Sequence, residues 1–125
     1  MKREKRILVV DDEPDNISVF SIGLEDEGFT VDTFTDPQLA LSAFKAKTYD
    51  LLILDIKMPN MNGFELYEKV NKIDTKLKVC FLTAFGEGYH EEFRRRFPAS
   101  SFSDVNFIRK PIRINDLVKK VNDII

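Results

Sequence analysis

The sequence has little of several features that mark specialised classes of protein. Only one cysteine, Cys80, stands among the 125 residues, so no internal disulfide can form, which fits a reducing compartment. There is no basic excess: 19 Lys and Arg are set against 21 Asp and Glu, whereas a general nucleic-acid binder carries surplus positive charge. The apolar run after the basic start, Ile7–Val10, is too short for a signal-peptide core or a membrane span. These absences favour a cytoplasmic protein that binds neither nucleic acid nor a membrane directly.

What remains is the composition of a single globular domain. Hydrophobic residues make up 43% of the chain and charged residues 32%. A chain of this length buries roughly two-thirds of the surface that its unfolded form exposes, so it folds without disulfides or metals. No linker, repeat or low-complexity segment interrupts it, and we expect one domain over residues 1–125.

Five short apolar runs alternate with segments of helical periodicity. Several of the runs are continuous, as expected of strands buried on both faces of a parallel sheet. The runs are Ile7–Val10, Phe29–Phe34, Leu51–Leu54, Val79–Leu82 and Val105–Ile108. Strands that alternate with helices indicate an α/β protein, so the pattern predicts a (βα)₅ doubly wound parallel sheet with helices on both faces.

The segments between these runs predict five helices. Gly28 is expected to end the first helix, and Asp36 followed by Pro37 is expected to begin the second. The predicted inward faces are Ile17, Phe20 and Leu24; Leu39, Ala40, Ala43 and Phe44; Phe64, Tyr67 or Glu68, and Asn71; Tyr89, Phe93 and Phe97; and Leu117, Val121 and Ile124. The fourth helix must end or kink before Pro98, because proline cannot continue a helix.

Polar residues follow four of the five strands. Asp11 and Asp12 follow the first, Asp55 the third, Thr83 the fourth and Lys110 the fifth. In a sheet of strand order 2-1-3-4-5 these residues converge, because sites in such sheets lie beyond the carboxyl ends of the strands. Three carboxylates in one cavity repel unless a divalent cation lies among them, and all-oxygen ligands suit Mg²⁺. A hydroxyl and an ammonium opposite them complete a pocket suited to a phosphoryl group.

Each residue also has a purely structural interpretation. Asp11 and Asp12 could cap the first helix, Asp55 could be a turn aspartate, Thr83 could be a helix cap, and Lys110 with its following proline could form an ordinary turn. The functional interpretation is favoured because all of these residues fall at the same end of one sheet.

Together these residues resemble the receiver domain of two-component response regulators. The matching pieces are Asp11-Asp12, Asp55 within LLILDIKMPNMNG, Thr83-Ala84 after VCFL, and Lys110-Pro111 after NFIR. The resemblance covers nearly the whole chain, and the strand-3 stretch is its most specific piece. It implies a flavodoxin-like fold and a signalling switch that catalyses only its own phosphorylation and slow dephosphorylation.

The resemblance implies a role for each residue of the acidic cluster. Asp55 is the phosphoacceptor and attacks the phosphohistidine of a sensor histidine kinase or phosphotransfer protein, or a small phosphodonor. Asp11, Asp12, Asp55 and the backbone carbonyl of Lys57 hold Mg²⁺.

The resemblance also implies a switch. Thr83 and Lys110 contact the phosphoryl group, and Phe107 turns inward as Thr83 moves, signalling to an unknown downstream protein. The Lys110-Pro111 peptide bond is expected to be cis. Asn16 and its neighbours on the first helix are expected to meet the phosphodonor. The segment Pro98–Asn106 departs from the usual receiver pattern. The resemblance therefore gives the weakest support for the properties of the surface near this segment.

Two other functions remain open from the sequence. A receiver used only as a constitutive binding module would usually lack one of the pocket residues, and none is missing here. An aspartyl-phosphate hydrolase of the haloacid-dehalogenase type needs a second Asp two residues after the nucleophile, where this chain has Lys57.

Overall fold

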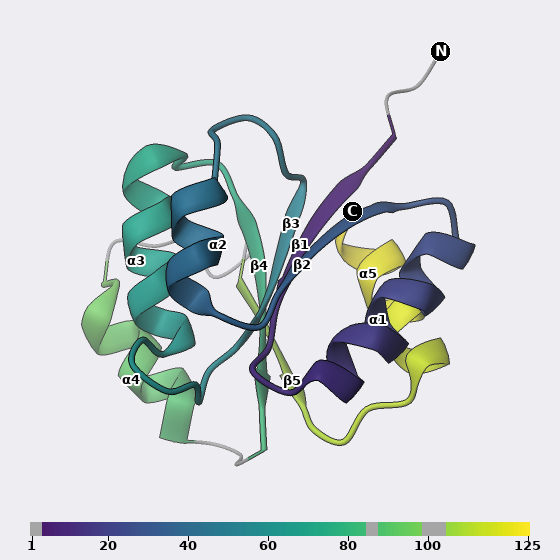
Figure 1. Ribbon diagram of the computed structural model, residues 1–125. Helices are drawn as coiled ribbons and strands as arrows, with labels where there is room; N and C mark the ends of the chain where they lie inside the picture. The colour runs from purple at the N-terminus through teal and green to yellow at the C-terminus, as the bar shows by residue number, and fades with distance from the viewer. Residues whose placement is uncertain (1–3, 85–87, 99–104) are drawn as a thin grey trace.

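The computed structural model describes residues 4–84, 88–98 and 105–125, and within them all side chains except those of residues 88–90. Helices and strands alternate from one end of the chain to the other (Figure 1). The strands are β1 (Arg6–Val10), β2 (Thr30–Phe34), β3 (Leu51–Asp55), β4 (Lys78–Thr83) and β5 (Val105–Arg109). The helices are α1 (Pro14–Asp26), α2 (Pro37–Ala43), α3 (Gly63–Ile73), α4 (Gly88–Arg96) and α5 (Ile114–Ile124).

The five strands form one parallel sheet in the order β2-β1-β3-β4-β5. This order confirms the predicted α/β doubly wound architecture. The central strand β3 is buried along its whole length, as the continuous apolar run Leu51–Leu54 before Asp55 predicts. Because all strands are parallel, their carboxyl ends meet at one edge, at the bottom of the sheet in Figure 1.

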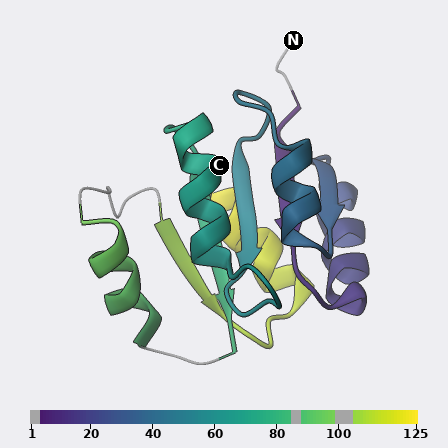
Figure 2. The same cartoon turned by 60° about the vertical axis from the view of Figure 1, so that its left-hand side comes forward.

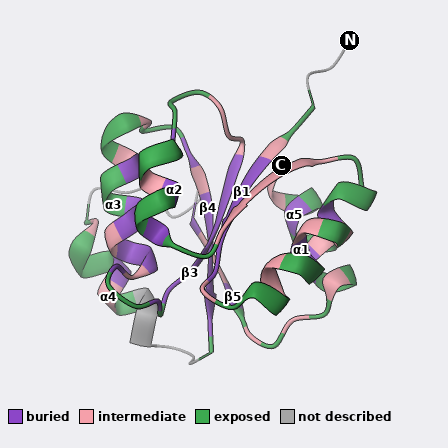
Figure 3. Ribbon diagram, viewed as in Figure 1, coloured by how far each residue is buried: buried purple, intermediate pink, exposed green. Residues whose placement is uncertain are grey.

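The helices form two layers, one on each face of the sheet. Helices α2, α3 and α4 cover one face, and α1 and α5 cover the other (Figures 1 and 2). The strands between them are largely buried, whereas the outer sides of the helices are exposed (Figure 3). Each layer encloses its own hydrophobic cluster, because side chains of a strand point alternately to opposite faces.

Several predicted element ends are confirmed. Gly28 follows α1 with a positive φ of 97°, and the Asp36 side chain accepts a hydrogen bond from the backbone N–H of Gln38 at the start of α2. Helix α4 ends at Arg96, before Pro98. Residues 99–104 of the atypical segment, and the side chain of Tyr89, lie outside the described residues.

The predicted inward face of α2 is wrong at two positions. Leu39 is 59% exposed and Ala43 is exposed as well, whereas Ala40 and Phe44 are buried. Pro37, Ala40 and Phe44 follow each other at intervals of three and four residues and form the buried stripe of this short helix. Leu39 lies about 100° away from Ala40 around the helix axis and therefore faces solvent.

Within the described ranges, no helix combines the length and the apolar character that a membrane span requires.

Candidate functional site

The carboxyl ends of β1 and β3 bring three acidic side chains together. Asp11 and Asp12 follow β1, Asp55 is the last residue of β3, and each offers a carboxylate oxygen within 4.8 Å of the others. Asp11 is fully buried and Asp55 is 5% exposed. The predicted convergence of these residues is therefore confirmed, and it follows from β1 and β3 being neighbours in the sheet.

Lys110, just after β5, reaches into the same cluster. Its Nζ lies 2.9 Å from Oδ2 of Asp11 and 3.2 Å from Oδ2 of Asp55. Glu13 is a more distant partner at 4.0 Å. The backbone N–H of Lys110 donates to the carbonyl of Thr83 at 2.7 Å, which ties the β5–α5 loop to the end of β4. The Lys110-Pro111 bond is cis, as predicted.

Asp11 is held in place by its neighbours on α1. Its Oδ1 accepts from the backbone N–H of Glu13 at 3.0 Å, and its Oδ2 accepts from the side-chain amide of Asn16 at 3.3 Å. The N-cap of α1 is Glu13, which makes no side-chain capping bond. The helix-cap interpretation of Asp11 and Asp12 is therefore not supported.

The charges of this cluster shift two pKa values. Burial, together with repulsion from Asp11, raises the pKa of Asp55 to about 7, although Lys110 acts in the opposite direction. Burial acts to lower the pKa of Lys110, but its hydrogen bond to Asp11 and the negative charges of Asp55 and Asp11 outweigh it, so the pKa is raised. Lys110 is thus a fixed cation, and one cation does not balance the three carboxylates.

The loop after Asp55 is shaped by tight packing against α3. Asn62 and Glu65 form a reciprocal capping box that begins α3. A Cβ at Gly63 would collide with the backbone carbonyl of Asp55 and approach Cα of Ile56 to 3.0 Å. The backbone N–H of Gly63 donates to the carbonyl of Ile56 at 2.8 Å. Gly63 therefore lets α3 approach the acidic residue closely and fixes the position of its backbone.

The remaining predicted site residues lie around this cluster. Thr83 ends β4 and is 6% exposed. The side chain of Lys57 is exposed, which is compatible with a role for its backbone carbonyl alone. Phe107 lies beside Phe81 in the register of β4 and β5 and packs against the cluster under α3 and α4. Phe107 is therefore a partly buried residue that packs against the core on that face of the sheet.

The donor set fits a hard divalent cation. The three carboxylates supply only oxygen ligands, and repulsion from Asp11 adds to the effect of burial in raising the pKa of Asp55. Asp12 is partly exposed, so its carboxylate can reach such a cation from the solvent side.

Sequence reasoning missed two contributions to this geometry. Asn16 was expected to meet a partner, but its hydrogen bond to Asp11 was not anticipated. The signal available was its position in the first turn of α1, directly after the acidic pair. Gly63 was noted as part of a motif, but only the folded structure shows that the Asp55 backbone leaves no room for a Cβ at this position.

Comparison with known proteins agrees with this geometry. The family model of the response regulator receiver domain matches residues 7–122. The response regulator receiver protein CpdR of Brucella abortus is 30% identical over 117 residues, which cover 94% of this chain and 93% of that protein. The crystal structure of response regulator TrrA from Thermotoga maritima, in complex with Mg(2+)-BeF, is 33% identical with a TM-score of 0.77, covering 97% of this chain and 99% of the other.

Some relatives are considerably longer than this chain. The transcriptional regulatory protein TcrA of Mycobacterium tuberculosis is 38% identical over 81 residues, but these are 65% of this chain and only 32% of TcrA. The chain thus spans about a third of that regulator and nearly all of CpdR. The match over residues 7–122 shows that the chain belongs to the response regulator receiver domain family of two-component signalling, whose standard function is to accept a phosphoryl group.

Proposed function

We propose that Asp55 is the residue that accepts the phosphoryl group, in a Mg²⁺-dependent reaction. The observation that carries this proposal is the position of its carboxylate, buried within 4.8 Å of the Asp11 and Asp12 carboxylates and 3.2 Å from the Lys110 ammonium. Acidic oxygens on one flank can hold a cation, and an ammonium on the other can pair with phosphoryl oxygens. A carboxylate between them is placed to act as a nucleophile.

The transfer exchanges one bond to phosphorus for another. A carboxylate oxygen of Asp55 forms a bond to phosphorus while the bond from phosphorus to the imidazole nitrogen of a phosphohistidine breaks. The electron pair of that bond stays on the imidazole. With acetyl phosphate as donor, the leaving group is acetate. Lys110 keeps its proton throughout and pairs with an oxygen of the transferred group, because its pKa is raised.

Asp11, Asp12, Asp55 and the carbonyl of Lys57 are the groups that would hold Mg²⁺. When bound, the ion neutralises the developing charge on the phosphoryl oxygens and keeps the Asp55 carboxylate ionised. Asn16 orients Asp11 through its amide, so that one oxygen of Asp11 faces Lys110. The Thr83 hydroxyl, at the end of the neighbouring strand, donates to the transferred group.

We also propose that the phosphodonor docks on α1 and the β5–α5 loop. A groove of about 460 Å³ lies directly beside Lys110, with Asn16 and Val19 on one wall and Pro111 and Ile112 on the other. On α1, Val19 is 52% exposed and Ile22 is 62% exposed. Such a patch next to a buried nucleophile suits a partner that must bring its own reactive group to the pocket.

Matched substitutions on two helices test this docking site. Ile22→Asp should slow transfer from a phosphorylated histidine-phosphotransfer domain by about tenfold, a loss of about 1.4 kcal/mol, but leave acetyl phosphate reactivity unchanged. Leu39→Asp is the control, because Leu39 is 59% exposed on the opposite layer. Equal rates for the two variants with the protein donor would contradict the docking site.

Intact mass spectrometry tests the phosphoacceptor assignment. The chain should gain the mass of one phosphoryl group with acetyl phosphate and Mg²⁺, and none with EDTA. Asp55→Asn should abolish the gain, because an amide is not a competent nucleophile here. Asp36→Asn is the control, since Asn caps a helix as well as Asp does. An undiminished gain in Asp55→Asn would overturn the assignment.

A further inference from the structure

A group of lysines lies at the edge of the sheet opposite the candidate site. Lys45 and Lys47 belong to the loop that joins α2 to β3, and Lys76 belongs to the loop that joins α3 to β4. Both loops precede strands, so they lie at the amino ends of the sheet, at the top of Figure 1. The three lysines are exposed, and none of them forms an ion pair within the described part of the chain. Their positive charge is therefore available to a binding partner.

Two hollows, of about 430 and 400 Å³, adjoin these lysines. Tyr49 lines both hollows, which places them side by side. We call the two hollows together the Tyr49 groove. Their charged lining residues are Arg6, Lys45 and Asp32 in the first and Lys47, Lys76 and Asp74 in the second. Cations outnumber carboxylates in this lining, so the groove is positively charged although the whole chain has a net charge of -2.

The two carboxylates of the Tyr49 groove are already bound to other groups. Both oxygens of Asp74 accept backbone N–H groups, Oδ1 from Lys76 at 3.1 Å and Oδ2 from Lys47 at 2.9 Å. Oδ2 of Asp32 accepts a hydrogen bond from the hydroxyl of Tyr49 at 2.8 Å. Neither carboxylate contacts a lysine ammonium group, so the excess positive charge lies on lysine side chains that face solvent.

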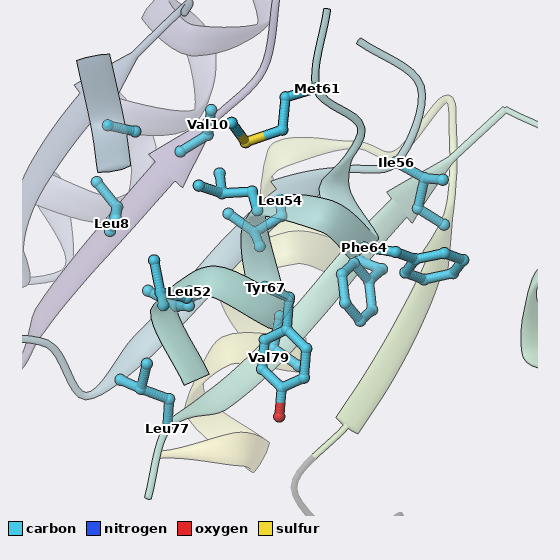
Figure 4. Packing of buried hydrophobic residues seen from close by; sticks show 14 of the residues in the cluster. Leu8, Val10, Leu52, Leu54, Ile56, Met61, Phe64, Tyr67, Leu77 and Val79 are labelled. Carbon is cyan, nitrogen blue, oxygen red and sulfur yellow. The ribbon is translucent and has the colours of Figure 1, made fainter. Parts of the chain in front are cut away.

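The walls of the Tyr49 groove are held in place from several sides. The ring of Tyr49 stacks on Phe44 with a centroid separation of 5.8 Å. Leu77, in the loop before β4, is 3% exposed and is one of the buried side chains shown in Figure 4. The hydrogen bond from Lys47 to Asp74 joins the two loops. A groove with ordered walls loses little conformational entropy when a ligand binds, which favours affinity.

The backbone at Lys47 is a further unusual feature. Its φ of 62° lies in the left-handed region, which glycine adopts more easily than lysine. The turn therefore does not require a lysine at this position. Residues held in this region are often found at binding sites.

The Tyr49 groove also contains exposed apolar surface. Ile73, the last residue of α3, is 48% exposed and lines the same hollow as Lys47 and Lys76. Apolar surface with charged residues around it is typical of sites that bind another protein. Small-molecule sites enclose most of their ligand, whereas the isoleucine and lysines here remain exposed. These features favour an extended polypeptide over a small molecule.

We propose that the Tyr49 groove binds an acidic segment of a partner protein. An apolar side chain of that segment packs on Ile73, and its carboxylates pair with Lys45, Lys47 and Lys76. The charge of the groove determines the charge of the partner. Because the groove and Asp55 lie at opposite edges of the sheet, a segment bound in the groove leaves the phosphoacceptor pocket accessible. The inference is independent of the proposed function and adds a second binding surface.

A chemical-shift titration with a short peptide tests the groove. The probe is the blocked peptide EEELEEE in about 20 mM NaCl, and KKKLKKK is the control of opposite charge. The acidic peptide alone should shift the amides of residues 45–49 and 73–77 saturably, with a Kd below about 1 mM. Salt at about 300 mM should weaken binding at least about fivefold, because exposed charges are screened. No saturable shift with EEELEEE, or equal shifts with KKKLKKK, would overturn the proposal.

Matched removal of charge tests the assigned lysines. Lys47→Gln combined with Lys76→Gln should weaken binding of EEELEEE at least about fivefold, because two exposed ion pairs are lost. Lys119→Gln combined with Lys120→Gln removes the same charge from the exposed side of α5 and should change the Kd less than about twofold. Equal weakening by the two double variants would indicate general electrostatic attraction and refute the groove.

A cycle between peptide and protein tests the apolar anchor. In the wild type, replacing the probe with EEEGEEE should weaken binding at least about threefold, because the leucine contact is lost. In Ile73→Ser the same replacement should weaken binding less than about 1.5-fold. The side chain of Ile73 is half exposed, so the variant should keep the dispersed amide spectrum of the folded chain. An equal loss in the wild type and in Ile73→Ser would refute packing on Ile73.

Other occupants of the groove would give different results. If inorganic phosphate at the same concentration shifted the same amides as EEELEEE, the groove would be a small-anion site and the proposal would be wrong. If these amides shifted with protein concentration in the absence of peptide, the occupant would be a second copy of the chain. Failure of the wild type to gain phosphoryl mass bears only on Asp55, so the two proposals can fail separately.

Discussion

The two faces of the sheet are packed with different kinds of side chain. On the face of α1 and α5 the buried cluster is almost entirely aliphatic. Among the described residues, Phe20 is its one buried aromatic member, and Phe29 is partly buried against it. On the face of α2, α3 and α4 the buried cluster contains Phe64, Tyr67, Phe81 and Phe93. The candidate site lies at the edge where these two layers meet.

The two layers therefore contribute differently to the candidate site. The aliphatic layer supports α1 and the β5–α5 loop, which supply Asn16 and Lys110 and so fix the orientation of Asp11. The aromatic layer adjoins Thr83 and carries α4. Its rings lie in contact, with centroid separations of 4.8 to 6.5 Å, so a displacement of one ring affects the packing of its neighbours. One layer therefore supports Asn16 and Lys110 of the candidate site, and the other adjoins Thr83.

The largest effect is expected from Phe93. Phe93→Ala should lower the free energy of unfolding by about 4 kcal/mol, because it removes a fully buried ring and leaves a cavity. Leu24→Ala, at a fully buried position of the aliphatic layer, should cost about 3 kcal/mol. Urea unfolding measures both. A cost for Phe93→Ala below 1 kcal/mol would show that α4 does not depend on this ring.

Removal of Lys110 should have the next largest effect. Lys110→Met in EDTA at pH 8 should lower the free energy of unfolding by about 3 kcal/mol, because it leaves the Asp11 and Asp55 carboxylates without their buried counter-charge. Added Mg²⁺ should restore part of the loss. Lys119→Met, on the exposed side of α5, is the control and should change little. Equal stability of the two variants would contradict the assigned electrostatics.

The close approach of Gly63 to Asp55 predicts a smaller loss. Gly63→Ala should cost about 2.5 kcal/mol, because the new Cβ meets rigid backbone. Gly23→Ala is the matched control on the other layer, where the new Cβ meets the side chain of Ile114, which can rotate. Since alanine also favours the helix, the net effect of Gly23→Ala should stay within about 1 kcal/mol. The reverse order of the two costs would refute this explanation.

The smallest effect is a gain in stability that depends on pH. The pKa of Asp55 is raised to about 7 in the folded chain from an ordinary 3.8, so the folded state binds the proton more tightly. The contribution of this group to stability is therefore full below about pH 4 and is lost as the pH rises through about 7. In EDTA at pH 8, Asp55→Asn should be more stable than the wild type by about 2 kcal/mol.

Unfolding at several pH values checks this prediction. The advantage of Asp55→Asn should shrink as the pH falls from 8 to about 4, because the wild-type carboxyl becomes protonated in the folded chain. An advantage that does not change with pH would mean that Asp55 is not the titrating group.

Much of the fold and site was predictable because it depends on order along the chain. The continuous apolar strands specify a parallel sheet, and a parallel sheet places Asp11, Asp55 and Lys110 at one edge. The failure at Leu39 has a different origin. In a helix of seven residues, two adjacent apolar stripes compete, and only the position of the sheet decides which one is buried.

Contacts that depend on the exact path of the folded chain could not be predicted. The bond from Asn16 to Asp11 depends on where α1 begins, and the approach of Gly63 to the Asp55 backbone depends on the path of a loop. The ring neighbours of Phe107 come from α3, β4 and α4, so its packing is a property of the assembled layer.

Chemical trapping of the phosphorylated residue tests the central claim most directly. After brief reaction with acetyl phosphate and Mg²⁺, borohydride reduces an aspartyl phosphate to homoserine, and peptide mapping then locates the changed residue. The account predicts homoserine at position 55 and unmodified Asp at positions 11 and 12. Homoserine at position 11 or 12, or phosphoryl mass gain without any reduction at position 55, would contradict it.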